Sequence, residues 1–417
     1  MTAQGKRIAP TDPESPAFMA RERAHAAHNY DPLPIVLAHG EGAWITDVDG
    51  RRYLDLMSAY SAVSFGHAHP AIVAALIKQA RELAVTSRAF YNDKLPLLLE
   101  RITKVTGLAR AIPSSGGAEA VETSLKAVRK WAYRVKGVPD GQAQVIVCRN
   151  NFHGRSITIV GFSSEPQYRD GFGPFPPGFV SIPYADAAAL EAAITPNTAA
   201  FLVEPVQGEG GIVVPPDGYL AECARICRAH RVLLICDEIQ TGLGRTGYTL
   251  ACEHDHVRPD GVILGKALGG GLLPVSMFVA TDDVMQVFRP GDHGSTFGGN
   301  PLASAVALAA LDVLERENLA SRSASLGAWL LSELRKIQSP LVKDVRGRGL
   351  FIGIEVDTNK TTARAVVDRL LARRVLSKDT HGTVVRIAPP LTVSRKDLAW
   401  AVGEIAAALD DLATSSP

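Results

Sequence analysis

Two charged residues follow neighbouring apolar runs of the sequence, and together they could do chemistry. Asp237 closes the apolar part of VLLICDE, and Lys266 stands between the run GVILG and a cluster of glycines. A buried lysine is costly unless it is paired, neutral or covalently used. One interpretation is a structural ion pair between the two residues. The other is a lysine that forms a Schiff base, with an aspartate that keeps the nitrogen of a heterocycle protonated.

Other residues could bind the phosphate and the ring of the cofactor that needs such a pair, pyridoxal phosphate. Gly117 stands at the start of an expected helix, where backbone N–H groups can point at an anion. Phe152 lies on a loop after an expected strand, where an aromatic ring could stack on the cofactor. Ser295 and Thr296 offer hydroxyl groups just before another expected helix. Glycine-rich helix starts are common, so this signal is weak when taken alone.

The hydrophobic pattern predicts the elements that must position these residues. Helices are expected over residues 71–84, 94–106, 118–135, 217–230 and 300–316, and strands over 145–149, 200–205, 232–238, 261–265 and 274–280. This alternation is typical of an α/β fold with a mostly parallel sheet, and strands that are apolar throughout indicate helices on both faces. Ligands bind at the carboxyl ends of such strands, where Asp237 and Lys266 stand.

The pattern changes after about residue 320 and predicts a second, α+β unit. Helices are expected over 320–337, 361–373 and 396–410, and strands within 345–357 and 384–388. The turn signal DVDG within residues 42–56 predicts a hairpin that joins this unit. We therefore expect an N-terminal segment (1–60) that packs with the small domain, a large cofactor-binding domain (61–318) and a C-terminal small domain (319–417). A site is expected in the cleft between the units.

Composition argues for small-molecule partners or a second copy of the chain. The 417 residues are 46% hydrophobic and carry a formal net charge of +1, which gives no electrostatic case for binding nucleic acid or an anionic membrane. No apolar run approaches the roughly 18 to 20 residues that span a bilayer. The first 30 residues lack a secretory apolar core and carry acidic side chains. We expect a cytoplasmic protein with a loosely ordered beginning.

Metal-binding patterns are incomplete. The five cysteines are scattered, which suits reduced thiols, and Cys223 and Cys227 are expected to pack on one face of a helix. The stretches GHAHP (66–70) and HDH (254–256) have no third ligand at a diagnostic spacing. The stretch GLGRTG (242–247) lacks the third glycine that a dinucleotide fingerprint requires. No metal is therefore expected.

Several longer stretches resemble the motifs of class III aminotransferases, which are pyridoxal-phosphate enzymes of fold type I. They are AHNYDPLP, SAYSAVSFGHAHP, TSRAFYN, GFGPFPPGF, VEPVQGEGG, DEIQTGLGRTG, LGKALGGGLLPVS, HGSTFGGNP, VRGRGL and THGTVVRIAPPL. The resemblance extends over about residues 26–411 and, within the family, points to the enzymes that act on ornithine. It implies a mostly parallel sheet of seven strands in the large domain. It also implies transfer of the δ-amino group of L-ornithine to 2-oxoglutarate, giving glutamate 5-semialdehyde, which cyclises to pyrroline-5-carboxylate, and glutamate, by a ping-pong route.

The resemblance assigns roles around the cofactor ring to four residues. Lys266 would form the Schiff base with pyridoxal phosphate and later carry a proton between substrate and cofactor carbons. Asp237 would hold the ring nitrogen, Gln240 would contact the ring hydroxyl, and Phe152 would stack on the ring. These four residues would make up the catalytic end of the site.

The phosphate would be bound from two subunits. Gly117 and Ala118 would offer backbone amides, and Thr296, with Ser295 beside it, would reach the phosphate of the neighbouring subunit. A homodimer with shared active sites is therefore implied, with a higher oligomer left open. One departure from the family concerns Gly116, which stands where a Ser or Thr is usual, although Ser115 could compensate. A second is His153, which replaces a tryptophan of some ornithine enzymes.

Five residues match the positions that contact substrate. Tyr30 and Arg155 would hold the α-amino and α-carboxylate groups of ornithine, and Tyr60 would favour ornithine over 4-aminobutyrate. Arg386 would bind the α-carboxylate of glutamate, and Glu209 would neutralise Arg386 while ornithine is bound. This pair has a physical logic, because an unpaired Arg386 would attract the α-carboxylate of ornithine and present the wrong amine.

Two alternatives remain open from the residues. Within the family, the substrate could be N-acetylornithine, lysine, 4-aminobutyrate or a specialised diamine. From another class, a metal-dependent or nicotinamide enzyme could use Lys266 and Asp237 as a structural ion pair. The colour of the purified protein distinguishes the classes, since bound pyridoxal phosphate is yellow.

Overall fold

The apolar runs form the centre of a seven-stranded sheet in the computed structural model, which describes residues 14–415. The strand order is β4 (Arg110–Ser114), β10 (Ser276–Ala280), β9 (Gly261–Leu264), β8 (Leu233–Asp237), β7 (Thr198–Val203), β5 (Gln144–Cys148) and β6 (Phe179–Ile182). Only β10 runs antiparallel to its neighbours in this sheet. Every residue of β7, β8 and β9 is buried. The predicted mostly parallel α/β sheet is therefore confirmed.

The helices expected around this sheet are present with small shifts at their ends. They are α3 (Pro70–Glu82), α4 (Leu95–Thr106), α5 (Gly117–Trp131), α9 (Tyr219–Ala229) and α11 (Pro301–Arg316). The helix expected over 118–135 ends earlier, because a π-helical turn, η1 (Ala132–Lys136), follows α5. Within residues 14–415, five short helices were not predicted: α2 (Ser58–Ser61), α6 (Ile157–Gly161), α7 (Pro166–Arg169), α8 (Ala187–Ala193) and α10 (Asp282–Met285). A helix of one or two turns is too short for a periodic signal.

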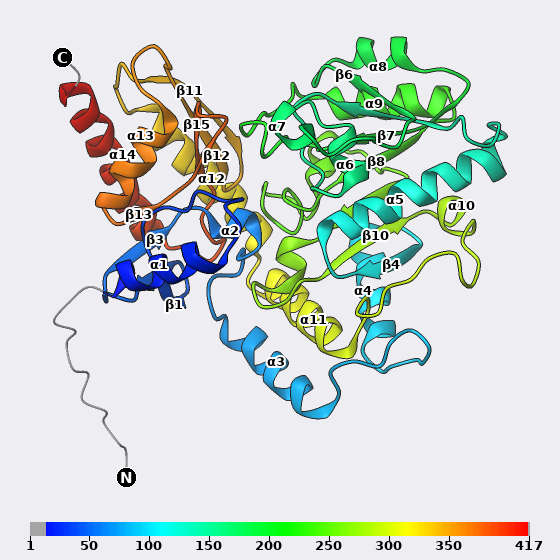
Figure 1. Cartoon of the computed structure of the whole chain (residues 1–417), viewed down its shortest axis with the longest axis horizontal. Coiled ribbons are helices and arrows are strands. Elements are labelled where there is room, and N and C mark those ends of the chain that lie inside the picture. Colours follow the sequence, from blue (N-terminus) through cyan, green and yellow to red (C-terminus); the bar gives the residue numbers. More distant parts are fainter. Residues whose placement is uncertain (1–13, 416–417) are drawn as a thin grey trace.

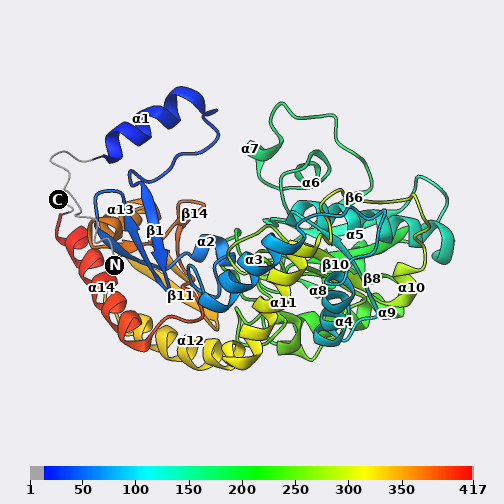
Figure 2. The same cartoon turned by 90° about the horizontal axis from the view of Figure 1, so that it is seen from below.

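A smaller unit follows α11 along the chain and lies beside the large sheet (Figure 1). Its antiparallel sheet has the order β11 (Val342–Arg348), β12 (Phe351–Val356), β15 (Val384–Ile387) and β14 (Asp379–Thr380). Three helices accompany it: α12 (Leu319–Arg335), α13 (Ala363–Ala372) and α14 (Arg395–Ser415). Figure 2 shows that α12 and α14 run along the outer side of these strands. The predicted α+β class of this region is confirmed.

A second small sheet joins the two ends of the chain. Its order is β1 (Leu37–Glu41), β2 (Trp44–Asp47), β3 (Arg52–Asp55) and β13 (Val375–Leu376). The hairpin expected at DVDG is the antiparallel pair of β2 and β3, and β13 pairs parallel with β3. Where the domains begin and end, at residues 61 and 319, stays a prediction.

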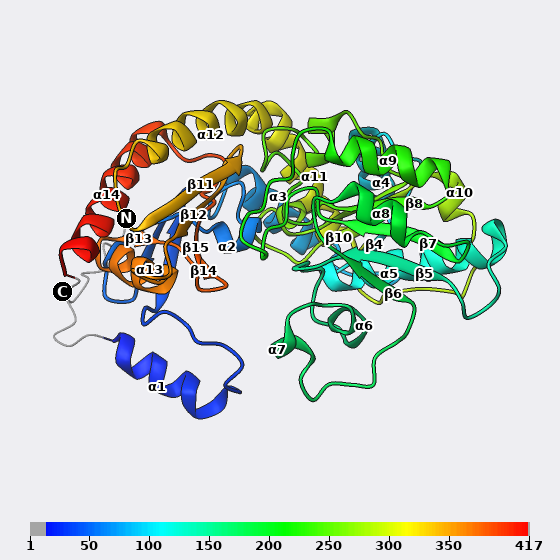
Figure 3. The ribbon, with the colours of Figure 1, turned by 90° about the horizontal axis from the view of Figure 1, so that it is seen from above.

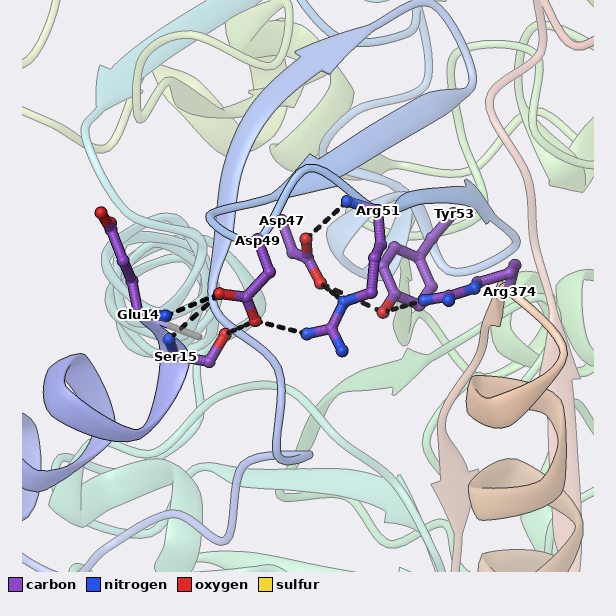
Figure 4. A network of polar contacts seen from close by, with 7 residues as sticks. All are labelled: Glu14, Ser15, Asp47, Asp49, Arg51, Tyr53 and Arg374. Atoms are coloured by element: carbon purple, nitrogen blue, oxygen red, sulfur yellow. Dashed lines mark hydrogen bonds and ion pairs between the residues drawn. The ribbon is translucent and has the colours of Figure 1, made fainter. Parts of the chain in front are cut away.

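The start of the described chain is helical, whereas we expected a loosely ordered beginning. Residues 1–13 lie outside the described part, but α1 (Ser15–His25) forms a helix beside the small sheet (Figure 3). Its first turn is held by the hairpin, because Asp49 accepts hydrogen bonds from the Glu14 N–H at 2.8 Å and the Ser15 hydroxyl at 2.7 Å. Arg51 joins Asp49 to Asp47 (Figure 4). This long-range cap carries no local sequence signal.

Three expected absences concern membranes, metals and disulfides. Among residues 14–415, none of the helices is long and apolar enough to cross a membrane. In the same range, no group of three or more His, Cys, Asp or Glu side chains is placed to hold a metal ion. All five cysteines are buried free thiols, and Cys223 and Cys227 lie on the buried face of α9 as expected.

Candidate active site

Asp237 and Lys266 face one cavity at the carboxyl edge of the parallel strands. Asp237 is the last residue of β8, and Lys266 begins a short 3-10 turn, η3 (Lys266–Gly269), directly after β9. The cavity has a volume of about 140 Å³. It is lined by Gly117, Ala118, Phe152, His153, Gly154, Glu204, Asp237, Ile239, Gln240, Thr241 and Lys266. The structure thus brings together the six residues expected around the cofactor within one subunit.

Asp237 is fixed by two hydrogen bonds. It is 4% exposed, its Oδ1 accepts from the Ile239 N–H at 3.0 Å, and its Oδ2 lies 2.7 Å from the Nδ1 of His153. Burial alone would lower the pKa of His153, but the contact with Asp237 outweighs it and the pKa is raised. The contact with Asp237 therefore favours the protonated form of the His153 ring. Sequence reasoning treated His153 only as a substitution, because nothing in the sequence connects it to a residue 84 positions away.

Lys266 combines a lowered pKa with an unusual backbone conformation. Removal from water lowers its pKa, the positive charge of Arg386 adds to this, and the carboxylates of Glu209 and Asp237 oppose it. An amine with a lowered pKa is more often neutral, which is the form that attacks an aldehyde. Its φ of 43° lies in the left-handed region, which disfavours residues other than glycine. Such strain is typical of functional positions.

Glu204 is a residue of this cavity that sequence reasoning missed. It is 7% exposed, and it accepts hydrogen bonds from the N–H of Phe152 at 2.9 Å and of Gly208 at 3.2 Å. Burial raises its pKa to about 7. Glu204 follows β7 as Asp237 ends β8, so the rule that drew attention to strand ends could have found it. Its contacts fix the loop that carries the Phe152 ring.

The start of α5 presents the N–H groups of Gly117 and Ala118 to the cavity, while the Glu119 carboxylate accepts from the N–H groups of Ser115 and Gly116 just before them. The N-cap of α5 is Gly116, which has no side chain to accept from the first N–H groups of the helix. A Cβ built on Gly117 would lie 3.1 Å from the Ile239 side chain, so the backbone approaches the cavity closely here. A wider cavity of about 390 Å³ adjoins the first, shares Gly117 and Lys266, and is also lined by Ser115. A helix N-terminus of this kind binds phosphate through backbone amides.

These donors fit pyridoxal phosphate. Lys266 offers an amine, Asp237 offers a fixed carboxylate for the ring nitrogen, Phe152 offers a flat ring, and the open start of α5 offers N–H groups to the phosphate. A structural ion pair between Lys266 and Asp237 is not present, since the carboxylate of Asp237 binds His153.

Replacing Gly116 by threonine is expected to tighten the binding of pyridoxal phosphate. Its φ of −101° and ψ of 151° suit threonine, and a Cβ at this position meets no atom within 4 Å. One added hydroxyl hydrogen bond of about 1 kcal/mol corresponds to a roughly fivefold lower dissociation constant. The constant is measured by titrating the apoprotein with pyridoxal phosphate and following absorbance. Gly116→Ala is the matched control, and equal affinities for the threonine and alanine variants would contradict the expectation.

The substrate end of the site contains an arginine whose two terminal nitrogens are paired with one carboxylate. Arg386 is 2% exposed and forms a two-pronged ion pair with Glu209, whose Oε1 lies 2.7 Å from Nη1 while Oε2 contacts Nη2. Burial would raise the pKa of Glu209, but Arg386 outweighs this and the pKa is lowered. The Arg386 guanidinium also lies 5.3 Å from the centre of the Tyr60 ring. Glu209, Arg386 and Tyr60 are therefore assembled as expected.

Besides Tyr60, Glu209 and Arg386, four expected site residues line neither of the two cavities. Tyr30 is 82% exposed, and the Arg155 guanidinium lies 3.9 Å from the centre of the Tyr168 ring instead. Ser295 accepts from the Gly298 N–H at 3.0 Å, and Thr296 is exposed. None of the four lines either cavity. Their roles toward substrate and a neighbouring subunit stay predictions.

Comparisons with known proteins agree with this site. The family model described as aminotransferase class-III matches residues 25–409. An ornithine aminotransferase of Bacillus subtilis is 55% identical over 91% of this chain and 94% of its own length. An ornithine aminotransferase structure from Toxoplasma gondii, described with partial occupancy of PLP at its active site, has a TM-score of 0.94 and 45% identity over 95% of this chain and 94% of that chain.

A third relative acts on a different substrate by name. The structure of an acetylornithine aminotransferase from Elizabethkingia anophelis has a TM-score of 0.87 and 45% identity, covering 95% of this chain and 99% of that chain. All of these matches extend over nearly the whole chain and agree with the family that the sequence motifs predicted. This chain belongs to the class III aminotransferases, the pyridoxal-phosphate enzymes of fold type I.

Proposed function

We propose that this enzyme transfers the δ-amino group of L-ornithine to 2-oxoglutarate and so gives glutamate 5-semialdehyde and glutamate. The observation that carries the proposal is the ion pair of Glu209 with Arg386, whose guanidinium lies over the Tyr60 ring. An enzyme that accepts both ornithine and a dicarboxylate needs an arginine that is paired with a carboxylate of the protein while ornithine is bound. The same arginine must be free to bind the dicarboxylate. The names of the most similar relatives support the same substrate.

Pyridoxal phosphate, when bound, supplies an aldehyde that accepts the amine and a ring that takes up electrons. Asp237 would hold the proton on the ring nitrogen, since its carboxylate is fixed in place by His153 and the Ile239 N–H. Gly117 and Ala118 would bind the phosphate through backbone N–H groups. Lys266 would hold the cofactor through its amine and, once released, move a proton at its Nζ.

The Glu209–Arg386 pair would select which amine reacts. While Glu209 is paired, Arg386 offers no free cation to the α-carboxylate of ornithine, so the δ-amine is presented to the cofactor. A dicarboxylate can compete for Arg386, because it replaces one charge-assisted carboxylate contact by another. Glu209 would then turn away, and the same pocket would accept glutamate or 2-oxoglutarate.

The half-reactions test the proposal. The purified enzyme is expected to be yellow, to bleach when L-ornithine is added alone, and to recover when 2-oxoglutarate follows. The parallel donors are lysine, 4-aminobutyrate and N-acetylornithine, the last because of the acetylornithine enzyme among the structural relatives. Ornithine is expected to bleach the protein at least about tenfold faster than each of them, which corresponds to about 1.4 kcal/mol of selectivity. Faster bleaching by N-acetylornithine would reassign the substrate but leave the family unchanged.

A homodimer and a cytoplasmic location belong to the same proposal. Thr296 is exposed on the loop before α11, where it could reach a second subunit, and Ser295 precedes it. Removing the Thr296 hydroxyl should weaken cofactor binding if a partner subunit shares its phosphate site.

A further inference from the structure

Four consecutive residues near the site adopt a left-handed turn. Ser58, Ala59, Tyr60 and Ser61 have φ angles of 44°, 45°, 58° and 73°, and none of them is glycine. Left-handed backbone is disfavoured for every residue with a Cβ, and it occurs as single residues rather than as runs. A run of four persists only when its surroundings determine it. The left-handed turn, residues 58–61, is therefore a strained element that contacts outside it must hold.

The turn presents Tyr60 to the substrate end of the site. The Tyr60 ring lies under Arg386, with 5.3 Å between the guanidinium carbon and the ring centre. The Tyr60 carbonyl accepts from the side-chain amide of Gln240 at 3.4 Å, and Gln240 lines the cofactor cavity. A change in the backbone of this turn would move the Tyr60 ring relative to both Arg386 and the cofactor.

Arg245 lies behind the turn as a fully buried cation. Its exposure is 0%, and burial lowers its pKa to about 9, although the charge of Asp55 opposes this. None of the ion pairs found among residues 14–415 includes Arg245. Its Nη2 donates to the Ser58 hydroxyl at 3.5 Å, at the start of the turn, and to the Ser64 hydroxyl at 2.9 Å. The Ser64 hydroxyl in turn donates to the Ser61 carbonyl at 2.8 Å, at the end of the turn. An arginine buried without a carboxylate partner is costly, and a general structural role would be filled more cheaply by an apolar side chain.

The other prong of Arg245 reaches the segment that follows Arg386. Its Nη1 donates to the Pro389 carbonyl at 2.6 Å and to the Leu350 carbonyl at 3.0 Å. Pro389 follows Arg386 by three residues, and Ser58 donates to the neighbouring carbonyl of Ala388. A single guanidinium therefore connects the turn that carries Tyr60 to the chain that carries Arg386. Lysine could not do this, because it lacks the planar fork of donors.

We propose that Arg245 is a positioning residue for substrate selection: it holds the left-handed turn 58–61 and thereby places Tyr60 against Arg386. Arg245 itself touches neither substrate nor cofactor. The inference rests on the proposed function, in which Tyr60 favours ornithine over 4-aminobutyrate. It adds a residue outside the cavity that determines how well Tyr60 can do so.

The test is a double-mutant cycle on the substrate preference. Arg245→Lys is expected to lower the ratio of kcat/KM for ornithine to that for 4-aminobutyrate about tenfold, mainly through a higher KM for ornithine. In a Tyr60→Ala background the same change should lower the ratio no further, because the ring that Arg245 positions is absent. If Arg245 had a purely structural role, Arg245→Lys would instead lower kcat/KM for both substrates alike, and this loss would add to the effect of replacing Tyr60.

Two further variants keep the test decisive. Arg322→Lys is the matched control, since Arg322 also donates to backbone carbonyls, those of Leu391 and Val393, but does not contact the turn. It should leave the preference unchanged. If Arg245→Lys does not fold, Ser64→Ala removes one partner of Arg245 and is expected to shift the preference two- to threefold in the same direction. Cofactor absorbance and Tm are measured for every variant.

The outcomes separate this inference from the proposed function. The inference alone is overturned if the unmodified enzyme transaminates ornithine but the variants leave the preference unchanged. The same holds if their effects add to that of replacing Tyr60. An unmodified enzyme that does not accept ornithine overturns both. The inference is supported if Arg245→Lys or Ser64→Ala lowers the preference for ornithine, and if the same substitution has no further effect once Tyr60 is replaced.

Discussion

Replacing Lys266 by arginine is expected to abolish transamination, with a loss of at least about 10³-fold in kcat. General acid–base catalysis alone contributes roughly 10²–10⁴-fold, and this side chain would also bind the cofactor. Its pKa is lowered by burial, whereas a guanidinium stays protonated and cannot attack an aldehyde. Arginine has a similar length, so the loss would come from the missing free amine and not from a missing side chain. The rate of bleaching by ornithine in a single turnover measures it directly.

A second measurement identifies the bond without relying on activity. Treatment of the unmodified enzyme with borohydride should fix the cofactor to the peptide that contains Lys266, and mass spectrometry should find the added mass there. The Lys266→Arg protein should bind no cofactor in this way. Lys343→Arg is the matched control, because Lys343 is paired with Glu355 on the surface. Turnover within tenfold of the unmodified enzyme in Lys266→Arg would remove Lys266 from the mechanism.

The sequence predicted the parts of the fold that repeat a local pattern. The strands β5, β7, β8, β9 and β10 were found because runs of apolar residues reveal strands buried on both faces. Asp237 and Lys266 were then found because each follows such a strand. The family motifs added Glu209 and Arg386, which the folded chain brings into a direct ion pair. These residues have signals that lie close to them in the sequence.

The remaining features depend on contacts between distant parts of the chain. His153 has a role because it contacts Asp237, and the first turn of α1 is held by Asp49 on a hairpin. Neither contact is indicated by a periodic pattern in the sequence. The left-handed turn at 58–61 contradicts local preference, so no propensity argument could have predicted it. Arg245 belongs to the family motif DEIQTGLGRTG, but nothing in that motif indicates that its side chain contacts the turn. Strain of this kind is visible only once the folded backbone is known.

Replacing Glu209 by glutamine is expected to change which amine of ornithine reacts. Glu209 neutralises Arg386 through two contacts, and the lowered pKa of Glu209 keeps the pair ionised through neutral pH. Glutamine keeps the shape but not the charge, so Arg386 becomes available to the α-carboxylate of ornithine. A charge-assisted hydrogen bond contributes about 1.5 to 3 kcal/mol, so the ratio of α- to δ-transamination should rise roughly 10- to 100-fold. Product analysis separates 5-amino-2-oxopentanoate from glutamate 5-semialdehyde.

The charge of Glu209, and not the loss of an ion pair in general, should cause the change. Glu355→Gln is the matched control, because Glu355 pairs at 2.6 Å with a different arginine, Arg346, and not with Arg386. It should leave the product ratio unchanged. For glutamate, which must displace Glu209 from Arg386, the Glu209→Gln enzyme should show a lower KM. An unchanged product ratio together with an unchanged KM for glutamate would mean that Arg386 is not what presents the α-carboxylate, and that selection of the δ-amine depends on Tyr60 and the turn that carries it.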